Sequence, residues 1–411
     1  MVSEVPSSGG NTVRERMDRR QFIKSVWLGL FAGRFVRTSS LCAAEAMDFN
    51  LKAFEAERVL RLARQAMQAR PEAITAYTCP RSPGGPHDFY SEGDYWWPDP
   101  NNPDGPYIRR DGLINPDNFS GHRHAMIRMA KTVASLTAAA CITGQLEYGQ
   151  RAVEHLRTWF LNEQTKMNPH LLYAQAIKGI CTGRGVGIID TIHLAEVAQS
   201  ILVLERLGMI GQEDLAGLKR WFAKYLDWIN THPYGMEERN ARNNHGTCWV
   251  MQAAAFARLV GDQKVIDLCR QLFVQKLVPD QIAPDGSFPL ELARTRPYCY
   301  SLFNLDMMGI AAHLLSDRSD LWTFQNSRGG SLEKAMAFHH QFIQDKAKWP
   351  YRRDVIGFEL FPVRMPALLF GGLALGQSRY IELWKRLDPD PTDDEVVRNM
   401  PVRQPVLWVA A

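Results

Sequence analysis

Two short stretches of this sequence, about fifty residues apart, carry side chains that together suit one reaction. The first is Arg-Asn-Asn-His-Gly at residues 242–246, and the second is Glu-Leu-Ala-Arg-Thr-Arg-Pro-Tyr-Cys-Tyr at residues 291–300. They offer an amide, an imidazole, a guanidinium and a phenol. These groups suit the removal of a proton beside a carboxylate together with the expulsion of a neighbouring sugar oxygen, as in a polymer of uronic acids.

The proton on carbon 5 of a uronate is poorly acidic, because its loss places more negative charge on the carboxylate. Donors and a positive charge must therefore stabilise that group as the charge develops, while a base takes the proton and an acid reaches the leaving oxygen. Asn244 can donate, and His245 can be a donor or a base. Arg294 or Arg296 can bind a carboxylate with two hydrogen bonds.

A tyrosine of the second stretch, Tyr298 or Tyr300, is expected to act as base and acid. The free side chain has a pKa of about 10, and we expect neighbouring cations to lower it. Taken singly, each residue equally fits a structural role, such as an asparagine cap or a packed tyrosine. Their combination favours chemistry.

Six motifs, in this order, resemble the alginate lyase family of polysaccharide lyases over nearly the whole mature chain. They lie at residues 94–100, 111–116, 168–175, 183–185, 243–246 and 291–296. The resemblance implies an α/α toroid and an elimination reaction. It places the family's asparagine and histidine on Asn244 and His245, its arginine on Arg294 and its acid/base tyrosine on Tyr300.

One departure from the family keeps alternatives open. The family's spacing between arginine and tyrosine is one residue longer than that from Arg294 to Tyr300, so Arg296 and Tyr298 remain alternatives for these roles. The residues predicted to bind substrate in addition to the four catalytic candidates are Tyr95, Trp96, Trp97, Gln175, Arg184, Asn243, Arg296 and Tyr298.

The composition indicates a globular protein that does not bind nucleic acid. The chain has 411 residues, 45% of them hydrophobic, and a net charge of +4. Residues 1–46 hold seven Arg/Lys against four Asp/Glu, so the remainder is nearly neutral. An anionic polysaccharide partner must therefore meet a locally basic groove, and no run of basic and aromatic residues indicates nucleic acid.

The first 46 residues are predicted to be a twin-arginine signal peptide. Arg19 and Arg20 precede the apolar residues 26–32, and the small residues Ala44 and Ala46 suit cleavage. The apolar run is too short for a membrane span. A periplasmic or secreted protein follows, with no membrane contact after signal removal.

The cysteines predict neither a metal site nor a redox site. Six remain after the signal, none in a Cys-x-x-Cys pair, and most are expected to be buried free thiols. We find no motif for a cofactor, and the expected elimination needs neither a cofactor nor a metal.

Apolar residues at helical spacing predict an all-α fold, an incomplete α/α toroid without a C-terminal β-sandwich. The expected helices end at glycines 144, 208 and 261, and the last is expected to cover residues 365–386. A long loop over residues 71–120 carries Tyr95, Trp96 and Trp97, which can stack on sugar rings or close one end of the toroid. One catalytic domain is predicted over residues 47–400, followed by a tail over 401–411.

These features predict a polysaccharide lyase that cleaves a 1,4-linked polyuronate by β-elimination. A glycoside hydrolase on a similar toroid would instead need two carboxylates in the cleft. The residues that could supply such a pair are Asp94, Asp99, Asp190, Glu291 and Asp306. A glycan-binding protein without turnover is the third alternative. The sequence leaves open the polyuronate, endo or exo action, and the oligomeric state.

Overall fold

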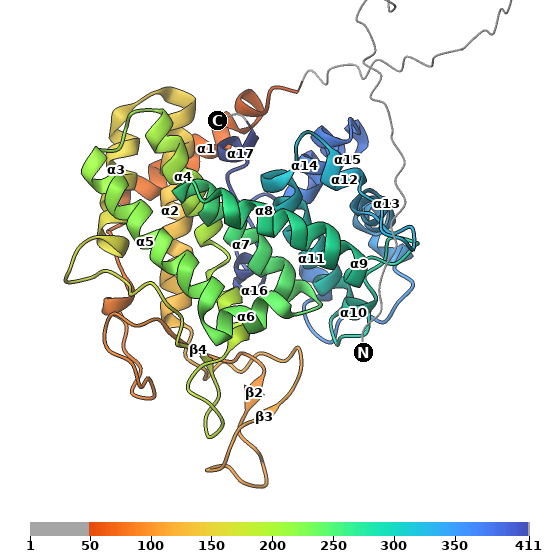
Figure 1. The fold of residues 1–411 in the computed structure, drawn as a ribbon, viewed down its shortest axis with the longest axis horizontal. Helices are drawn as coiled ribbons and strands as arrows, with labels where there is room; N and C mark the ends of the chain where they lie inside the picture. The colour runs from red at the N-terminus through yellow and green to blue at the C-terminus, as the bar shows by residue number, and fades with distance from the viewer. Residues whose placement is uncertain (1–48, 410–411) are drawn as a thin grey trace, which may run out of the picture. The chain divides into compact units, whose positions relative to one another are not determined.

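An inner row of buried helices organises the chain in this computed structural model, which describes residues 49–409 (Figure 1). The row consists of α2 (Gly121–Thr143), α4 (Leu194–Arg206), α7 (Asn244–Val260), α11 (Pro297–Leu315) and α14 (Pro366–Ala374), each in contact with the next. In α11 every residue except His313 is buried. A helix that is apolar on all sides lies inside a protein.

A second set of helices packs on the outside of this row. These are α1 (Leu51–Gln68) and α3 (Leu146–Phe160) on α2, α5 (Gln212–Thr231) and α8 (Gln263–Leu272) on α7, α13 (Leu332–Gln344) on α11, and α15 (Ser378–Arg386) on α14. The inner row with its outer partners confirms the predicted all-α fold of helical hairpins.

Shorter elements connect these helices. The helical ones are η1 (Ile74–Ala76), η2 (Gly185–Thr191), α6 (Pro233–Asn240), η3 (Phe273–Leu277), α9 (Val278–Gln281), α10 (Pro289–Leu292), α12 (Asp320–Thr323), η4 (Lys346–Lys348), η5 (Phe358–Leu360), α16 (Asp394–Arg398) and α17 (Val406–Val409). Strands within residues 49–409 form two pairs, so this part of the chain holds no β-sandwich.

Glycines end several helices as the sequence predicted. Gly144 and Gly261 lie in the left-handed region, with φ of 72° and 76°, at the ends of α2 and α7. Gly376, with φ of 64°, corrects one prediction, because the single helix expected over residues 365–386 is divided here into α14 and α15.

The predicted long loop forms one end of the molecule, where β2 and β3 project away from the helices (Figure 1). Strand β1 (Tyr90–Glu92) pairs in parallel with β4 (Tyr173–Ala176), and β2 (Trp96–Trp97) pairs antiparallel with β3 (Ile108–Arg109). Asn118 Nδ2 donates to the carbonyl oxygens of Gly93 (2.7 Å) and Trp96 (3.0 Å). These two bonds stabilise the loop internally, and the pairing of β1 with β4 holds it against the segment before α4.

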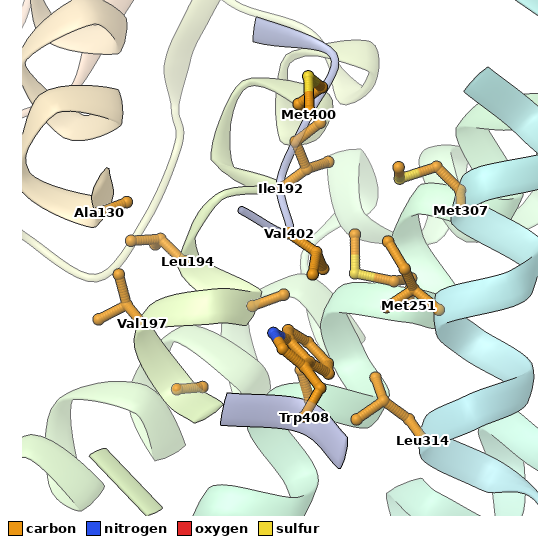
Figure 2. Packing of buried hydrophobic residues seen from close by; sticks show 14 of the residues in the cluster. Ala130, Ile192, Leu194, Val197, Met251, Met307, Leu314, Met400, Val402 and Trp408 are labelled. Atoms are coloured by element: carbon orange, nitrogen blue, oxygen red, sulfur yellow. The ribbon is translucent and has the colours of Figure 1, made fainter. Parts of the chain in front are cut away.

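The C-terminal segment differs from the predicted tail. Residues 400–408 are buried, and Met400, Val402 and Trp408 lie among side chains of the inner helices, including Leu194, Met251 and Met307 (Figure 2). This segment is an integral part of the core rather than an appendage. Its hydrophobic residues are spaced irregularly, so no helical periodicity marked them as core.

The described residues from 49 onward belong to one compact unit. The predicted signal peptide, residues 1–46, lies outside the described residues. By length and hydropathy α2 alone among the single helices of this part could cross a membrane, but most of it is buried by its neighbours.

Candidate active site

A cavity of about 310 Å³ lies where the loops before α4, α7 and α11 converge with the long loop. Most of its lining is polar or aromatic. The lining residues discussed below are Asp94, Tyr95, Trp96, Arg123, Gln175, Arg184, Asp190, His193, Asn243, Asn244, His245, Arg294, Tyr300 and Arg398. All four predicted catalytic residues are among them.

Asn244 is the first residue of α7 and is held by a buried carboxylate. Its backbone N–H donates to Glu291 Oε1 (2.8 Å) and its Nδ2 donates to Glu291 Oε2 (2.7 Å). Asn243 caps the same helix by accepting from the His245 backbone N–H (3.4 Å). Glu291 uses one N–H of the Asn244 side chain, so the second can donate to a ligand in the cavity.

His245 is oriented by Glu238, a buried residue of α6. Their Nδ1 and Oε1 atoms are 2.7 Å apart, and this contact leaves Nε2 for the cavity. Burial opposes a charge on the imidazole, but the Glu238 carboxylate outweighs it, so the pKa of His245 is raised. Burial also raises the pKa of Glu238. The carboxylate facing Nδ1 favours a proton on that nitrogen and stabilises the protonated form of the ring, in which Nε2 is a donor to the cavity.

Arg294 lies beside the ring of Tyr300. Its Nη2 and Nε donate to the two carboxylate oxygens of Asp111 at 3.0 and 3.3 Å, and its Cζ is 4.4 Å from the ring centroid of Tyr300. Although burial opposes the charge on Asp111, Arg294 and Thr295 hold the pKa of that carboxyl at about 2. The ion pair places a cation next to the phenol.

Tyr300 donates its hydroxyl proton to the hydroxyl oxygen of Tyr95 (2.9 Å) and is 9% exposed. The structure corrects the expectation that cations lower its pKa. Burial and the neighbouring Tyr95 raise the pKa of Tyr300, and together they outweigh the opposing effect of Arg294. The phenol is therefore protonated in this structure and is set up as an acid.

Three of the residues predicted to bind substrate, Trp96, Gln175 and Arg184, also line the cavity. Gln175 has a positive φ of 51°, and its backbone N–H donates to Ser91 Oγ (2.8 Å). Arg184 Nη2 donates to Gln175 Oε1 (2.9 Å), and the Arg184 Cζ lies 5.8 Å from the ring centroid of Trp96. Together they supply an amide, a guanidinium and an aromatic face that suit a sugar ring.

Three other predicted residues lie outside the cavity lining. Trp97 Nε1 donates to the Leu113 carbonyl oxygen (2.9 Å) and supports the projecting loop. Tyr298 is fully buried, with its hydroxyl on the Phe342 carbonyl oxygen (3.0 Å). Arg296 is fully buried and pairs with Glu395. The geometry therefore favours Tyr300 and Arg294 over these two alternatives for contact with substrate.

Several lining residues were missed by the sequence analysis. Arg123 Nη2 donates to Asp94 Oδ1 (2.6 Å), and its Nη1 lies 3.3 Å from Asp190 Oδ1. Arg398 Nη1 also pairs with Asp94, at 2.6 Å. Arg123 lies inside an apolar helix and Arg398 lies just before the predicted tail, so neither had a local signal in the sequence. Glu238, which orients His245 but does not line the cavity, was missed because α6 was not predicted.

The carboxylates of the cavity do not form a hydrolytic pair. Asp94 is buried, but Arg123 and Arg398 outweigh the effect of burial and hold its pKa well below the usual range. Asp190 accepts hydrogen bonds from Ser91 Oγ (2.5 Å) and Gln175 Nε2 (3.0 Å). A hydrolase needs a carboxyl group that is free to reach the leaving oxygen. The arginines hold Asp94, and Ser91, Gln175 and Arg123 hold Asp190, so neither side chain is free for that role.

The described residues contain no group of three or more His, Cys, Asp or Glu side chains that could hold a metal ion. The cavity instead gathers cations and hydrogen-bond donors around a space of sugar size. A helical toroid with an amide, an imidazole, a guanidinium and a phenol at one cavity defines a polysaccharide lyase of the α/α type.

Comparison with known proteins agrees with this class. The profile of the alginate lyase family matches residues 73–349. An alginate lyase from Bacteroides ovatus is 32% identical, with a TM-score of 0.74 over 89% of this chain and 95% of that chain. The chain belongs to the alginate lyase family. A search of curated proteins gave no match.

Two more distant structures share the fold. A variant of alginate lyase A1-III in complex with a tetrasaccharide has 14% identity and a TM-score of 0.53, over 86% of this chain and 93% of that chain. Alginate lyase A1-III from Sphingomonas species A1 has 14% identity and a TM-score of 0.51, over 85% of this chain and 94% of that chain. At this identity the likeness concerns the fold alone.

Proposed function

We propose that this enzyme cleaves a 1,4-linked polyuronate by β-elimination and leaves a 4,5-unsaturated uronate at the new end. The observation that carries the proposal is the convergence of Asn244, His245, Arg294 and Tyr300 on one cavity. The first three supply donors and positive charge for a carboxylate, where the negative charge of the transition state develops. Tyr300 supplies the proton for the leaving oxygen.

The state of His245 bears on the stereochemistry. An imidazolium that pairs with Glu238 binds a carboxylate well but cannot take a proton. The base is then Tyr300 in its ionised form, a minor form that the Arg294 charge 4.4 Å from the ring stabilises. This favours substrates whose carbon 5 proton and leaving oxygen lie on the same face of the sugar, namely β-mannuronate and β-glucuronate. In α-guluronate they lie on opposite faces.

In this scheme Tyr300 is both the base and the acid of the elimination. The ionised Tyr300 takes the carbon 5 proton, and the electron pair of that bond forms the double bond between carbons 4 and 5. The bond from carbon 4 to the bridging oxygen breaks. Tyr300 returns the proton to that oxygen and is left ionised again, so no cofactor is consumed.

We propose alginate rich in mannuronate as the substrate, with glucuronan as the second polymer of suitable stereochemistry. Support for alginate comes from the 32% identical relative, which is described as an alginate lyase. We also propose that the enzyme acts outside the cytoplasm, because Arg19 and Arg20 precede an apolar segment in the leader.

The test is a panel of pure polymers: polymannuronate, polyguluronate and polyglucuronate. Ultraviolet absorbance of the conjugated product is followed for the wild type and for Tyr300→Phe, with Tyr298→Phe as the matched control. We expect a rise on polymannuronate or polyglucuronate that is lost in Tyr300→Phe and kept in the control. A faster rise on polyguluronate would overturn the assignment of the base, and new reducing ends without absorbance would indicate a hydrolase.

A further inference from the structure

The C-terminal strap, defined here as residues 394–409, reaches from the core to the active site. It comprises α16, the extended residues 399–405 and α17. Glu196 of α4 anchors its distal part, because Oε1 accepts from the backbone N–H groups of Arg403 and Gln404, each at 2.8 Å, and from Trp408 Nε1 at 3.3 Å. One buried carboxylate thus fixes three donors of the strap.

Further contacts fix the strap near both of its ends. His193 Nε2 lies 2.9 Å from the Arg398 carbonyl oxygen, and Gln199 Nε2 donates to the Leu407 carbonyl oxygen at 2.7 Å. Because α4 belongs to the inner row, these contacts attach the strap to the inner helices of the toroid. The backbone at Arg398 is therefore fixed independently of its side chain.

The Arg398 side chain reaches into the cavity lining and is 17% exposed. Its Nη1 pairs with Asp94 (2.6 Å), its Nε pairs with Glu395 (2.6 Å), and its Nη2 donates to the hydroxyl oxygen of Tyr95 (3.1 Å). Two carboxylates therefore hold the guanidinium in place, and Nη2 donates both to Glu395 Oε1 (3.2 Å) and to the phenol of Tyr95. A fixed arginine fork of this kind orients its third partner.

The Tyr95 oxygen also accepts the hydroxyl proton of Tyr300 (2.9 Å). The Tyr95 oxygen thus accepts from both Arg398 and Tyr300. Loss of the Arg398 bond frees the Tyr95 hydroxyl to rotate and removes a positive charge from the vicinity of both phenols. Tyr95 lies in the long loop and Tyr300 on α11, so the strap determines how these two elements meet.

We propose that Arg398 is a positioning residue for the elimination, and that it acts through Tyr95 to orient the hydroxyl of Tyr300. This proposal rests on the proposed function, in which Tyr300 transfers the proton. The charged and titratable groups that face Tyr95 are Arg398 and Glu395 from α16, Arg296 before α11, and Tyr300 itself. Arg398 is the cation among them that donates directly to the Tyr95 oxygen.

The test compares Arg398→Gln and Arg398→Lys with Arg403→Gln as the matched control. Arg403 lies on the same strap and is 7% exposed, but its guanidinium is outside the cavity lining. We expect Arg398→Gln to fold, because neither buried carboxylate loses its last ion-pair partner: Asp94 still pairs with Arg123, and Glu395 still pairs with Arg296. Thermal unfolding of all three variants confirms that they are folded before kinetics are measured.

For Arg398→Gln we expect kcat to fall about 10- to 100-fold with KM within about twofold, as for the loss of a hydrogen bond to a charged group. The rising limb of the pH–rate profile moves to higher pH, because a cation near the phenols is lost. Arg398→Lys recovers part of the rate, and Arg403→Gln keeps it. An unchanged kcat, an equal loss in Arg403→Gln, or a rise in KM alone would overturn the proposal.

A second readout does not depend on turnover. The chemical shift of the hydroxyl-bearing ring carbon of labelled tyrosines is measured by NMR, with Tyr95 and Tyr300 assigned from their phenylalanine variants. We expect both signals to move in Arg398→Gln and neither to move in Arg403→Gln. If the wild type eliminates no polyuronate, the proposed function fails, while these shifts still decide whether Arg398 orients the pair. Unmoved signals would refute the proposal.

Discussion

The contact between Glu238 and His245 offers a sharp test of how the active site is charged. Glu238→Gln keeps the size of the side chain and a hydrogen-bonding group beside His245 Nδ1, but removes the negative charge 2.7 Å away. We expect the carboxylate-binding role of His245 to weaken, because its imidazolium loses the partner that stabilises it. The fold should persist, since the substitution removes a buried charge.

The size of the effect follows from the contact that is changed. A charge-assisted hydrogen bond is roughly twice as strong as a neutral one, and bonds to charged groups contribute about 1.5 to 3 kcal/mol. Replacing one kind with the other therefore costs about 1 to 2 kcal/mol. Because about 1.4 kcal/mol corresponds to a factor of ten in rate, we expect kcat/KM to fall about 5- to 30-fold.

The pH–rate profile of the variant should shift in a defined direction. Glu238 raises the pKa of His245, so the imidazolium persists to higher pH in the wild type. In Glu238→Gln the pKa of His245 falls, and the decline of kcat/KM at the alkaline end should begin at lower pH. The assay is the initial rate of ultraviolet absorbance on polymannuronate over a series of pH values.

Glu237→Gln is the matched control, because it makes the same change on the same helix at an exposed position. It should leave both the rate and the pH profile unchanged. An alkaline limb that stays in place in Glu238→Gln, or moves to higher pH, would refute the imidazolium and make neutral His245 the base.

Three further predictions concern other contacts. Arg294→Lys keeps the charge but loses the two-point contact with Asp111, so kcat/KM should fall by about tenfold or more in the same assay. Tyr298→Phe loses only the bond to the Phe342 carbonyl oxygen; denaturant unfolding should show a loss of about 1 kcal/mol, and the rate should not change. The pKa of Glu196 is raised by burial from 4.5 to about 7, so the folded protein binds this proton more tightly than the unfolded chain does. Glu196 therefore adds stability as pH falls from about 7 to 4.5, and the difference in unfolding temperature between wild type and Glu196→Gln should vary with pH over that window; a constant difference would contradict the buried carboxyl.

Much of the fold could be predicted because helices leave local signals. Apolar spacing and the glycines at 144 and 261 marked the ends of α2 and α7. The short α6 was missed because its sequence, Pro-Tyr-Gly-Met-Glu-Glu-Arg-Asn, has little apolar periodicity. Residues 401–409 of the strap were predicted to be a tail, because their burial depends on contacts with α4 that are distant in sequence.

In the candidate site, too, the residues with a local sequence signal were predicted, and those that depend on contacts distant in sequence were not. Asn244 and His245 were found because a cap, a helix start and two chemical groups coincide in one motif. Tyr298 and Tyr300 are two positions apart at the start of α11, so they point to different sides of the helix. Sequence alone could not tell which side meets the cavity, and it could not reveal that burial raises the pKa of Tyr300.

The role of Arg398 lies furthest from sequence reasoning. It depends on a guanidinium from the C-terminal strap, a carboxylate at Asp94 and a phenol at Tyr95, which meet only in the folded chain. No spacing rule connects positions some three hundred residues apart.

The central claim is that the sugar bond is broken by elimination, and one measurement tests it directly. Polymannuronate, or polyglucuronate if that is the polymer cleaved, is digested in water labelled with oxygen-18. The masses of the oligosaccharides are then measured by mass spectrometry. Elimination adds no water, so the account predicts unsaturated products without the label, and their absence with Tyr300→Phe. Saturated products that carry one labelled oxygen at the cleaved bond would show hydrolysis and contradict the account.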